Sequence, residues 1–214
     1  MRGVSPVINN IWFIRGIRKG IKTERFPEES PGEIAPWSTA LKGSGSADCP
    51  VEAIVDGKWI FDRCVFCRKC LPAFSPTGDY NIFEVRGKDE NFKKSFHIFP
   101  LDSGACGACN AELHNIAAPQ YDMTRFGIFF TNTPRHADAI VIMGVWTEGM
   151  EKALDLALDA MPGPKLIIAM GACAATGGII GKGAMKNEKY DVIMGGCPPN
   201  PYTILSALGK AKGD

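Results

Sequence analysis

The sequence predicts an α/β protein whose main domain is a doubly wound parallel sheet. In the second half of the chain, short apolar runs alternate with segments of helical periodicity, which is typical of a parallel sheet with crossover helices. Glycine-rich turns that carry cysteines follow several of these runs, and open α/β sheets place their ligands at the carboxyl ends of strands. A chain of 214 residues, of which 45% are hydrophobic, suffices for one such domain and a smaller appendage.

Residues 95–214 are expected to form the main domain. Its expected elements are, in chain order, a strand at 96–101, a helix near 107–118, strands at 126–131 and 138–143, a helix at 148–160, strands at 165–170 and 191–195, and a helix at 200–210. This alternation predicts a flavodoxin-like strand order. In the helix at 148–160, apolar residues recur at helical spacing, which indicates core packing.

Residues 1–26 form a basic amphipathic segment. They contain six basic side chains and one acid, Glu24, interleaved with isoleucines, valine and tryptophan that share one face of a helix. Such a segment can lie on an anionic membrane surface or dock on a partner subunit, and the sequence leaves both open. Residues 27–48 are rich in Pro, Gly, Ser and Glu and are expected to be an extended linker.

The first cysteine motif lies in a small domain expected at residues 27–94. Cys64, Cys67 and Cys70 follow the spacing Cys-x2-Cys-x2-Cys, and Cys49 is followed by proline. In bacterial ferredoxins a Cys-Pro cysteine completes the cluster begun by the three cysteines of the other repeat. These four therefore predict one 4Fe-4S site, with structural zinc as the alternative.

The ligands of a second ferredoxin cluster are missing. By the same spacing they would stand at positions that hold Thr39, Lys42, Gly45 and Phe74. The segment thus resembles a ferredoxin-like α+β domain reduced to one cluster. The following residues, 72–94, are expected to be a polar connection with a short strand near 80–85.

The second cysteine set lies in the main domain and consists of Cys106, Cys109, Cys173 and Cys197, each beside glycines at the end of an expected strand. Soft thiolates on closely wrapping backbone are typical of an iron–sulfur cluster. Disulfides and structural zinc are the alternatives. No secretory leader is recognised, so we expect a reducing compartment in which disulfides rarely persist. Zinc sites also usually pair two local Cys-x-x-Cys hairpins, whereas this set has one pair and two distant single cysteines.

These motifs resemble a known family over about the last 120 residues. The motifs are Cys106-Gly-Ala-Cys109-Asn-Ala-Glu112, Gly171-Ala-Cys173-Ala-Ala-Thr-Gly-Gly178 and Gly196-Cys197-Pro-Pro. They resemble the small subunit of energy-converting, membrane-associated NiFe hydrogenases and the homologous subunit of respiratory complex I. The complex I version typically begins with two adjacent cysteines, so the separation of Cys106 from Cys109 favours the hydrogenase branch. Asn200 stands where the family often carries Arg.

The resemblance implies an electron-transfer subunit with two 4Fe-4S clusters. Its partner would be a NiFe hydrogenase-like large subunit that holds the NiFe centre, since this chain lacks the paired Cys-x-x-Cys motifs of such a subunit. Further ferredoxin-like and membrane subunits would complete the complex. The resemblance also makes Glu112 a candidate for a proton path to the active site. The alternative for Glu112 is an acid that compensates the dipole at a helix start.

Two other functions remain open at this stage. One is a complex I-like relative whose last cluster reduces a quinone or a sulfur compound, and the other is a scaffold with structural metals. A net charge of +1 and the absence of a regular basic pattern exclude nucleic acid as an expected partner. No apolar run approaches the roughly eighteen residues of a membrane span. We therefore expect a cytoplasmic protein, held peripherally on the cytoplasmic face of a membrane through its partners.

Overall fold

The computed structural model describes residues 38–185 and 187–214, which belong to one compact unit. The basic segment at 1–26 and the first part of the expected linker lie outside the described residues. The described strands are β1 (Leu41–Gly43), β2 (Ile54–Val55), β3 (Lys58–Trp59), β4 (Phe74–Pro76), β5 (Phe83–Val85), β6 (Phe96–Gly104), β7 (Ile128–Phe130), β8 (Ala139–Gly144), β9 (Leu166–Met170) and β10 (Val192–Met194). The described α-helices are α2 (Ala108–Asn115), α3 (Glu148–Ala160), α4 (Gly171–Thr176) and α5 (Pro201–Ala211).

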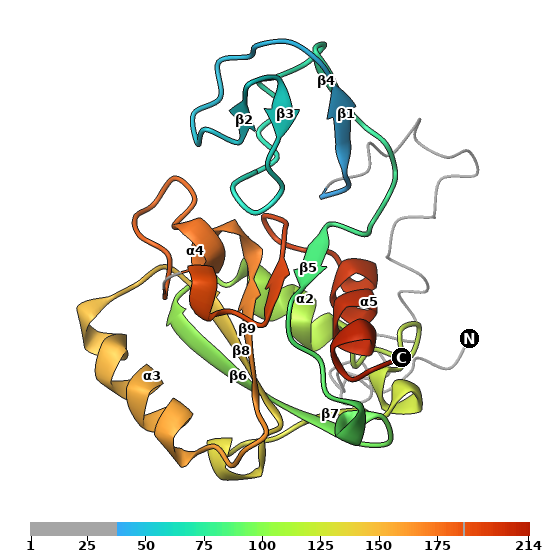
Figure 1. Cartoon of the computed structure of the whole chain (residues 1–214), viewed down its shortest axis with the longest axis vertical. Coiled ribbons are helices and arrows are strands. Elements are labelled where there is room, and N and C mark those ends of the chain that lie inside the picture. Colours follow the sequence, from blue (N-terminus) through green and yellow to red (C-terminus); the bar gives the residue numbers. More distant parts are fainter. Residues whose placement is uncertain (1–37, 186) are drawn as a thin grey trace, which may run out of the picture. The chain divides into compact units, whose positions relative to one another are not determined.

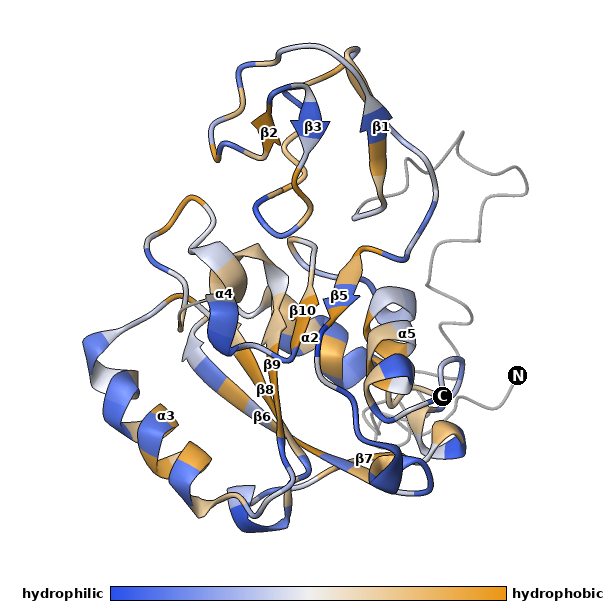
Figure 2. Ribbon diagram, viewed as in Figure 1, coloured by the Kyte–Doolittle hydropathy of each residue, from blue (hydrophilic) through white to orange (hydrophobic). Residues whose placement is uncertain are grey.

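The main domain is a six-stranded sheet in the order β5-β10-β9-β8-β6-β7 (Figure 1). Strands β6 to β10 are parallel to one another and follow the flavodoxin-like order, as the sequence predicts. Every residue of β8, at the centre, is buried. Because parallel strands are covered on both faces, such strands are apolar throughout, and Figure 2 shows this apolar centre in β8, β9 and β10.

Two pairs of helices cover the two faces of the sheet. On one face α2 and α5 contribute Leu113, Ile204 and Leu208 to a core shared with alternate strand residues such as Ile98 and Val141. On the other face α3 and α4 pack Leu154, Ala157, Ala174 and Ala175 against strand residues that include Ile140 and Ile142. The alternation of strand side chains between the two faces thus builds two separate cores around one sheet.

Helix boundaries follow from local chemistry. Helix α5 begins with Pro201 at its first position, and Asn200 caps it because the Asn200 side chain accepts a hydrogen bond of 3.0 Å from the backbone N–H of Thr203. Helix α3 carries Glu148 and Glu151 in its first turn, where carboxylates compensate the helix dipole. These helices match the expected 200–210 and 148–160 within one residue.

Residues 38–76 build a smaller layer from two two-stranded sheets. Strand β1 pairs antiparallel with β4, and β2 pairs with β3 across the Asp56-Gly57 turn, where both residues have positive φ (51° and 71°). A small core that includes Ala53, Phe66 and Ile82 lies beneath them. No helix occurs within residues 38–82, so the ferredoxin-like α+β character of this part stays a prediction.

The structure has features that the sequence patterns do not predict. Strand β1 and the buried Ser38 and Thr39 lie in what was expected to be a linker. Strand β5 matches the short strand predicted near 80–85, but its pairing with the main sheet, as an antiparallel edge beside β10, is not predicted. Helix α4 follows β9 directly and spans only Gly171–Thr176, which is too short to show helical periodicity.

Candidate metal centres

The eight cysteines are all free thiols and fall into two spatial groups. The first group consists of Cys49, Cys64, Cys67 and Cys70, which line one pocket beside the β2–β3 hairpin. Within the short loop that carries three of them, Phe66 and Arg68 have positive φ values of 54° and 64°. Such left-handed residues curl the backbone tightly, so this loop curves around the pocket that its cysteines line.

The sulfurs of the first group influence one another. Burial raises the pKa of the Cys64 thiol, and the like charges of Cys49 and Cys70 raise it further. Burial also raises the pKa of Cys70, to which Cys67 and Cys49 add. Without a cation these thiols therefore resist ionisation, whereas a bound metal would hold them as thiolates.

The second group gathers at the carboxyl ends of three strands of the main sheet. Cys106 and Cys109 follow β6, with Gly107 between them at the start of α2, where its φ is 92°. Cys173 lies in α4, directly after β9, and Cys197 follows β10. Since neighbouring parallel strands end at the same edge of a sheet, cysteines far apart in sequence meet there.

The pKa shifts of these thiols also indicate that the four cysteines lie close together. The pKa of the Cys109 thiol is raised to about 12, first by burial and then by the like charges of Cys173, Cys197 and Cys106. Burial raises the pKa of Cys173 and of Cys197, and each of these two also responds to Cys106. All four members thus lie within electrostatic reach of one another.

Glycines leave room for these sulfurs, so the residues present fit a bulky metal group. A β-carbon at Gly171 would lie 2.8 Å from Sγ of Cys109, and one at Gly178 would lie 3.4 Å from Sγ of Cys173. Both glycines have positive φ. Four soft thiols in a glycine cradle are the donor set of an iron–sulfur cluster. Among the described residues, no three His, Cys, Asp or Glu side chains are positioned to hold a single metal ion.

Asp102 shapes the loop of the second group, a role that cysteine spacing alone did not indicate. Its Oδ1 accepts hydrogen bonds from the backbone N–H groups of Gly104 (2.9 Å) and Ala105 (2.7 Å). Its Oδ2 accepts one from the side-chain amide of Asn110 at 3.1 Å. Asp102 thus ties both flanks of the Cys106 to Cys109 loop. The sequence signal is an aspartate two residues before a glycine, which is typical of an Asx turn.

The two groups lie close to each other in the described unit. The same Gly178 β-carbon that would approach Cys173 would stand 3.6 Å from Cγ1 of Val65, in the loop of the first group. Hydrogen bonds also join residues before the main domain to residues in it. Ser38 Oγ donates to the carbonyl of Pro198 at 2.6 Å, and Thr203 Oγ1 donates to the carbonyl of Tyr80 at 2.7 Å.

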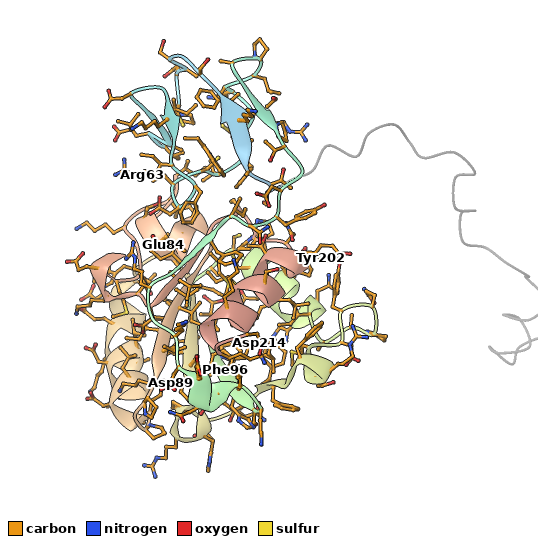
Figure 3. The ribbon with its side chains drawn as sticks, turned by 45° about the vertical axis from the view of Figure 1, so that its right-hand side comes forward. Arg63, Glu84, Asp89, Phe96, Tyr202 and Asp214 are labelled. Carbon is orange, nitrogen blue, oxygen red and sulfur yellow. The ribbon has the colours of Figure 1, made fainter. Side chains whose placement is uncertain are left out.

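Glu112 lines a cavity between the loop of the first cysteine group and the main domain. The cavity has a volume of about 360 Å³ and is lined by Val65, Phe66, Glu112, Cys197 and Asn200, among others. Near it, Tyr202 projects from the start of α5 (Figure 3) and contacts Tyr80 and Tyr121, with ring centroids 5.3 and 5.5 Å apart. Glu112 is half-buried and therefore placed to meet both solvent and the cysteine edge.

The second half of the chain is similar to known proteins. The family model for the 20 Kd subunit of NADH ubiquinone oxidoreductase matches residues 106–211. An uncharacterized protein of Methanocaldococcus jannaschii is 34% identical over 123 residues, which cover 55% of this chain and 83% of the relative. A chain in the structure of the membrane-bound sulfane sulfur reductase, an archaeal respiratory membrane complex, is 29% identical and covers 56% of this chain and 70% of its own, with a TM-score of 0.48. In the described part of the chain, no helix is long and apolar enough to span a membrane.

Proposed function

Because this chain belongs to the family of the 20 Kd subunit of NADH ubiquinone oxidoreductase, we propose that it passes electrons to or from a NiFe centre in a hydrogenase complex. Family membership makes it an electron-transfer subunit of a complex I-like oxidoreductase. The observation that carries the narrower proposal is the Cys106-Gly-Ala-Cys109 loop, since two residues separate cysteines that are typically adjacent in complex I. The NiFe centre itself would lie on a partner large subunit.

The proposal assigns two 4Fe-4S clusters to the chain. Cys49, Cys64, Cys67 and Cys70 would hold one cluster, and Cys106, Cys109, Cys173 and Cys197 the other. When bound, such clusters supply one-electron carriers. The chain's own contribution is to supply thiolates, and to exclude water around Cys64 and Cys109, which are both buried. Val65, in the loop of the first group, lies near Gly178, where an added β-carbon would stand 3.6 Å from its Cγ1, and electron transfer between the two groups requires such proximity.

Glu112 is proposed to carry protons toward the partner's active site. It lines the same cavity as Cys197, on the edge of the sheet where the second group lies. Replacing Glu112 with glutamine removes the proton-accepting carboxylate while keeping its size. In the intact complex, Glu112→Gln should slow hydrogen turnover and change its pH profile, while Glu148→Gln, on the exposed start of α3, should change neither. An unaltered rate and pH profile in Glu112→Gln would remove Glu112 from the proton path.

The proposed partners are a hydrogenase-like large subunit, further ferredoxin-like subunits and membrane subunits. The chain would then lie on the cytoplasmic face of the membrane, held there by these partners. The exposure of Cys106 and Cys197 supports a partner on this edge, because iron–sulfur ligands that transfer electrons rapidly must face their acceptor closely.

Hydrogen turnover by the intact complex tests the proposal. The complex is purified without oxygen and assayed for hydrogen uptake and evolution with an artificial dye as electron partner. A Cys173→Ser complex serves as the matched control and should lose turnover. Turnover of hydrogen that depends on Cys173 supports the proposal. Reduction of a quinone or a sulfur compound, without hydrogen turnover, would instead favour the complex I-like alternative.

A further inference from the structure

The indole N–H of Trp59 is buried without a hydrogen-bond acceptor among the described residues. Indole has only this one donor, and buried tryptophans usually pair it. Trp59 lines the pocket of Cys49, Cys64, Cys67 and Cys70 and stands five residues before Cys64. A donor that loses its hydration in a pocket of thiols indicates that its acceptor belongs to the group bound there.

The indole ring is held in place by local packing. Trp59 pairs with Ile54 across the β2–β3 hairpin. Its ring meets Phe66 edge to face, with centroids 6.3 Å apart and an angle of 75° between the planes. Phe66 itself lies in the loop between Cys64 and Cys67, so one aromatic contact fixes the indole relative to the cysteine loop.

Of the four cysteines that line this pocket, only Cys64 is buried. Its sulfur is therefore the acceptor that suits a buried indole donor in the same pocket. A neutral thiol is a weak acceptor, whereas hydrogen bonds to charged acceptors are shorter and stronger.

We propose that Trp59 donates its indole N–H to the sulfur of Cys64 in the metal-loaded site and thereby raises the reduction potential of that centre. This inference rests on the proposed function, because it requires an iron–sulfur centre at Cys49, Cys64, Cys67 and Cys70. Hydrogen bonds to cluster sulfurs stabilise the more negative, reduced state. Trp59 acts through Cys64 and is thus a positioning residue that tunes the centre.

The test compares wild-type protein with Trp59→Phe in the intact complex, by a redox titration followed by paramagnetic resonance. Phenylalanine keeps an aromatic ring against Phe66 and removes only the donor. We expect the centre at Cys64 to become harder to reduce, by up to about tenfold in its reduction equilibrium, which for one electron is about 59 mV. The centre at Cys173 should keep its potential and serves as an internal control.

Trp146→Phe is the matched control variant, since Trp146 is exposed and follows β8 in the main domain. It should leave the centre at Cys64 unchanged. An unchanged potential in Trp59→Phe, with full iron content, overturns the inference while leaving the proposed function intact. Protein that binds zinc or no iron at all overturns both.

A second measurement, on wild-type protein, tests the inference if the Trp59→Phe protein does not bind iron. Wild-type protein with 15N-labelled indole nitrogens is reduced, and electron–nuclear double resonance is used to detect nuclei coupled to the centre. We expect a coupled, exchangeable indole proton and its nitrogen, and the Trp146→Phe protein should show the same coupling. Absence of any indole coupling at the reduced centre overturns the inference.

Discussion

Gly171 lies directly against Cys109, such that a β-carbon at position 171 would stand 2.8 Å from Sγ of Cys109. The φ of Gly171 is +87°, a conformation that residues with side chains rarely adopt. Position 171 thus requires glycine for two reasons: the backbone turns in a left-handed conformation at the end of β9, and a side chain there would collide with a candidate ligand.

Replacing Gly171 with alanine should therefore destabilise the protein by about 1–2 kcal/mol or more and displace Cys109. We expect loss of the paramagnetic signal of the second centre, with the first retained. Gly149→Ala is the control: a β-carbon at this position in α3 would meet no atom within 4 Å, and alanine should stabilise this helix by roughly 0.5–1 kcal/mol. Retention of both signals in Gly171→Ala would show that the cradle tolerates a methyl group.

The grouping of the cysteines predicts roughly eight irons per chain, in two centres that can be removed one at a time. Cys64→Ser should abolish the signal of the first centre and leave the second. Cys173→Ser should do the reverse. Iron analysis and paramagnetic resonance of reduced protein measure both effects. The simultaneous loss of both signals from a folded single variant would contradict two independent centres.

Asp102 should lower the reduction potential of the second centre. Its carboxylate is tied to the loop between Cys106 and Cys109 by three hydrogen bonds and adds negative charge there. Asp102→Asn removes that charge and should shift the potential of the second centre to more positive values, with the first centre unchanged. Asp89 caps the turn that precedes β6, whereas Asp102 lies near the other end of that strand. Asp89→Asn should therefore shift neither potential. An equal effect of both variants would show that only net charge matters.

The raised pKa of Tyr190 predicts a loss of stability at alkaline pH. Its pKa is raised to about 12, mainly by burial. The folded protein thus holds this proton more tightly than the unfolded chain, in which the pKa of tyrosine is about 10. The free energy of unfolding should fall as the pH rises between these values. Urea unfolding of the metal-free protein at about pH 8 and about pH 11 measures this, and Tyr190→Phe should show a smaller fall.

The same variant should also be less stable at neutral pH. The Tyr190 hydroxyl donates to the carbonyl of Ala174 and accepts from the N–H of Met185, both at 2.9 Å. Phenylalanine leaves both partners without the hydroxyl, at a cost of about 1–3 kcal/mol. Tyr121→Phe is the control, because Tyr121 is only partly buried and should change stability little. A Tyr190→Phe protein as stable as wild type would refute this role.

The cysteine edge of the sheet should be covered in the assembled complex. Ile179 and Ile180, in the loop after α4, are 71% and 59% exposed, and Cys106 and Cys197 are exposed nearby on the same edge of the sheet. An obligate interface typically buries more than about 2,000 Å². Hydrogen exchange should therefore slow at residues 104–109, 171–178 and 195–201 in the complex relative to the isolated chain. Equally fast exchange in both states would favour a free electron carrier.

Local patterns in the sequence determined most of the main domain. The strands at 138–143 and 165–170 and the helix at 148–160 match β8, β9 and α3 within one residue, because apolar runs and helical periodicity are properties of neighbouring residues. The strand order, which the structure confirms, followed from the alternation of strands and helices. The assignment of the cysteines as cluster ligands came from their spacing, their glycine-rich surroundings and the family resemblance, and it stays a prediction.

Only the tertiary structure decided the features that depend on residues far apart in the chain. Strand β5 lies antiparallel beside β10 because pairing with that exposed edge satisfies its backbone, which no periodicity within the segment signals. The approach of Val65 to Gly178 and the cavity that Glu112 shares with Cys197 likewise require folding. The buried indole N–H of Trp59 is visible only once packing has removed its water. Long-range packing makes these contacts, and a linear pattern contains no record of them.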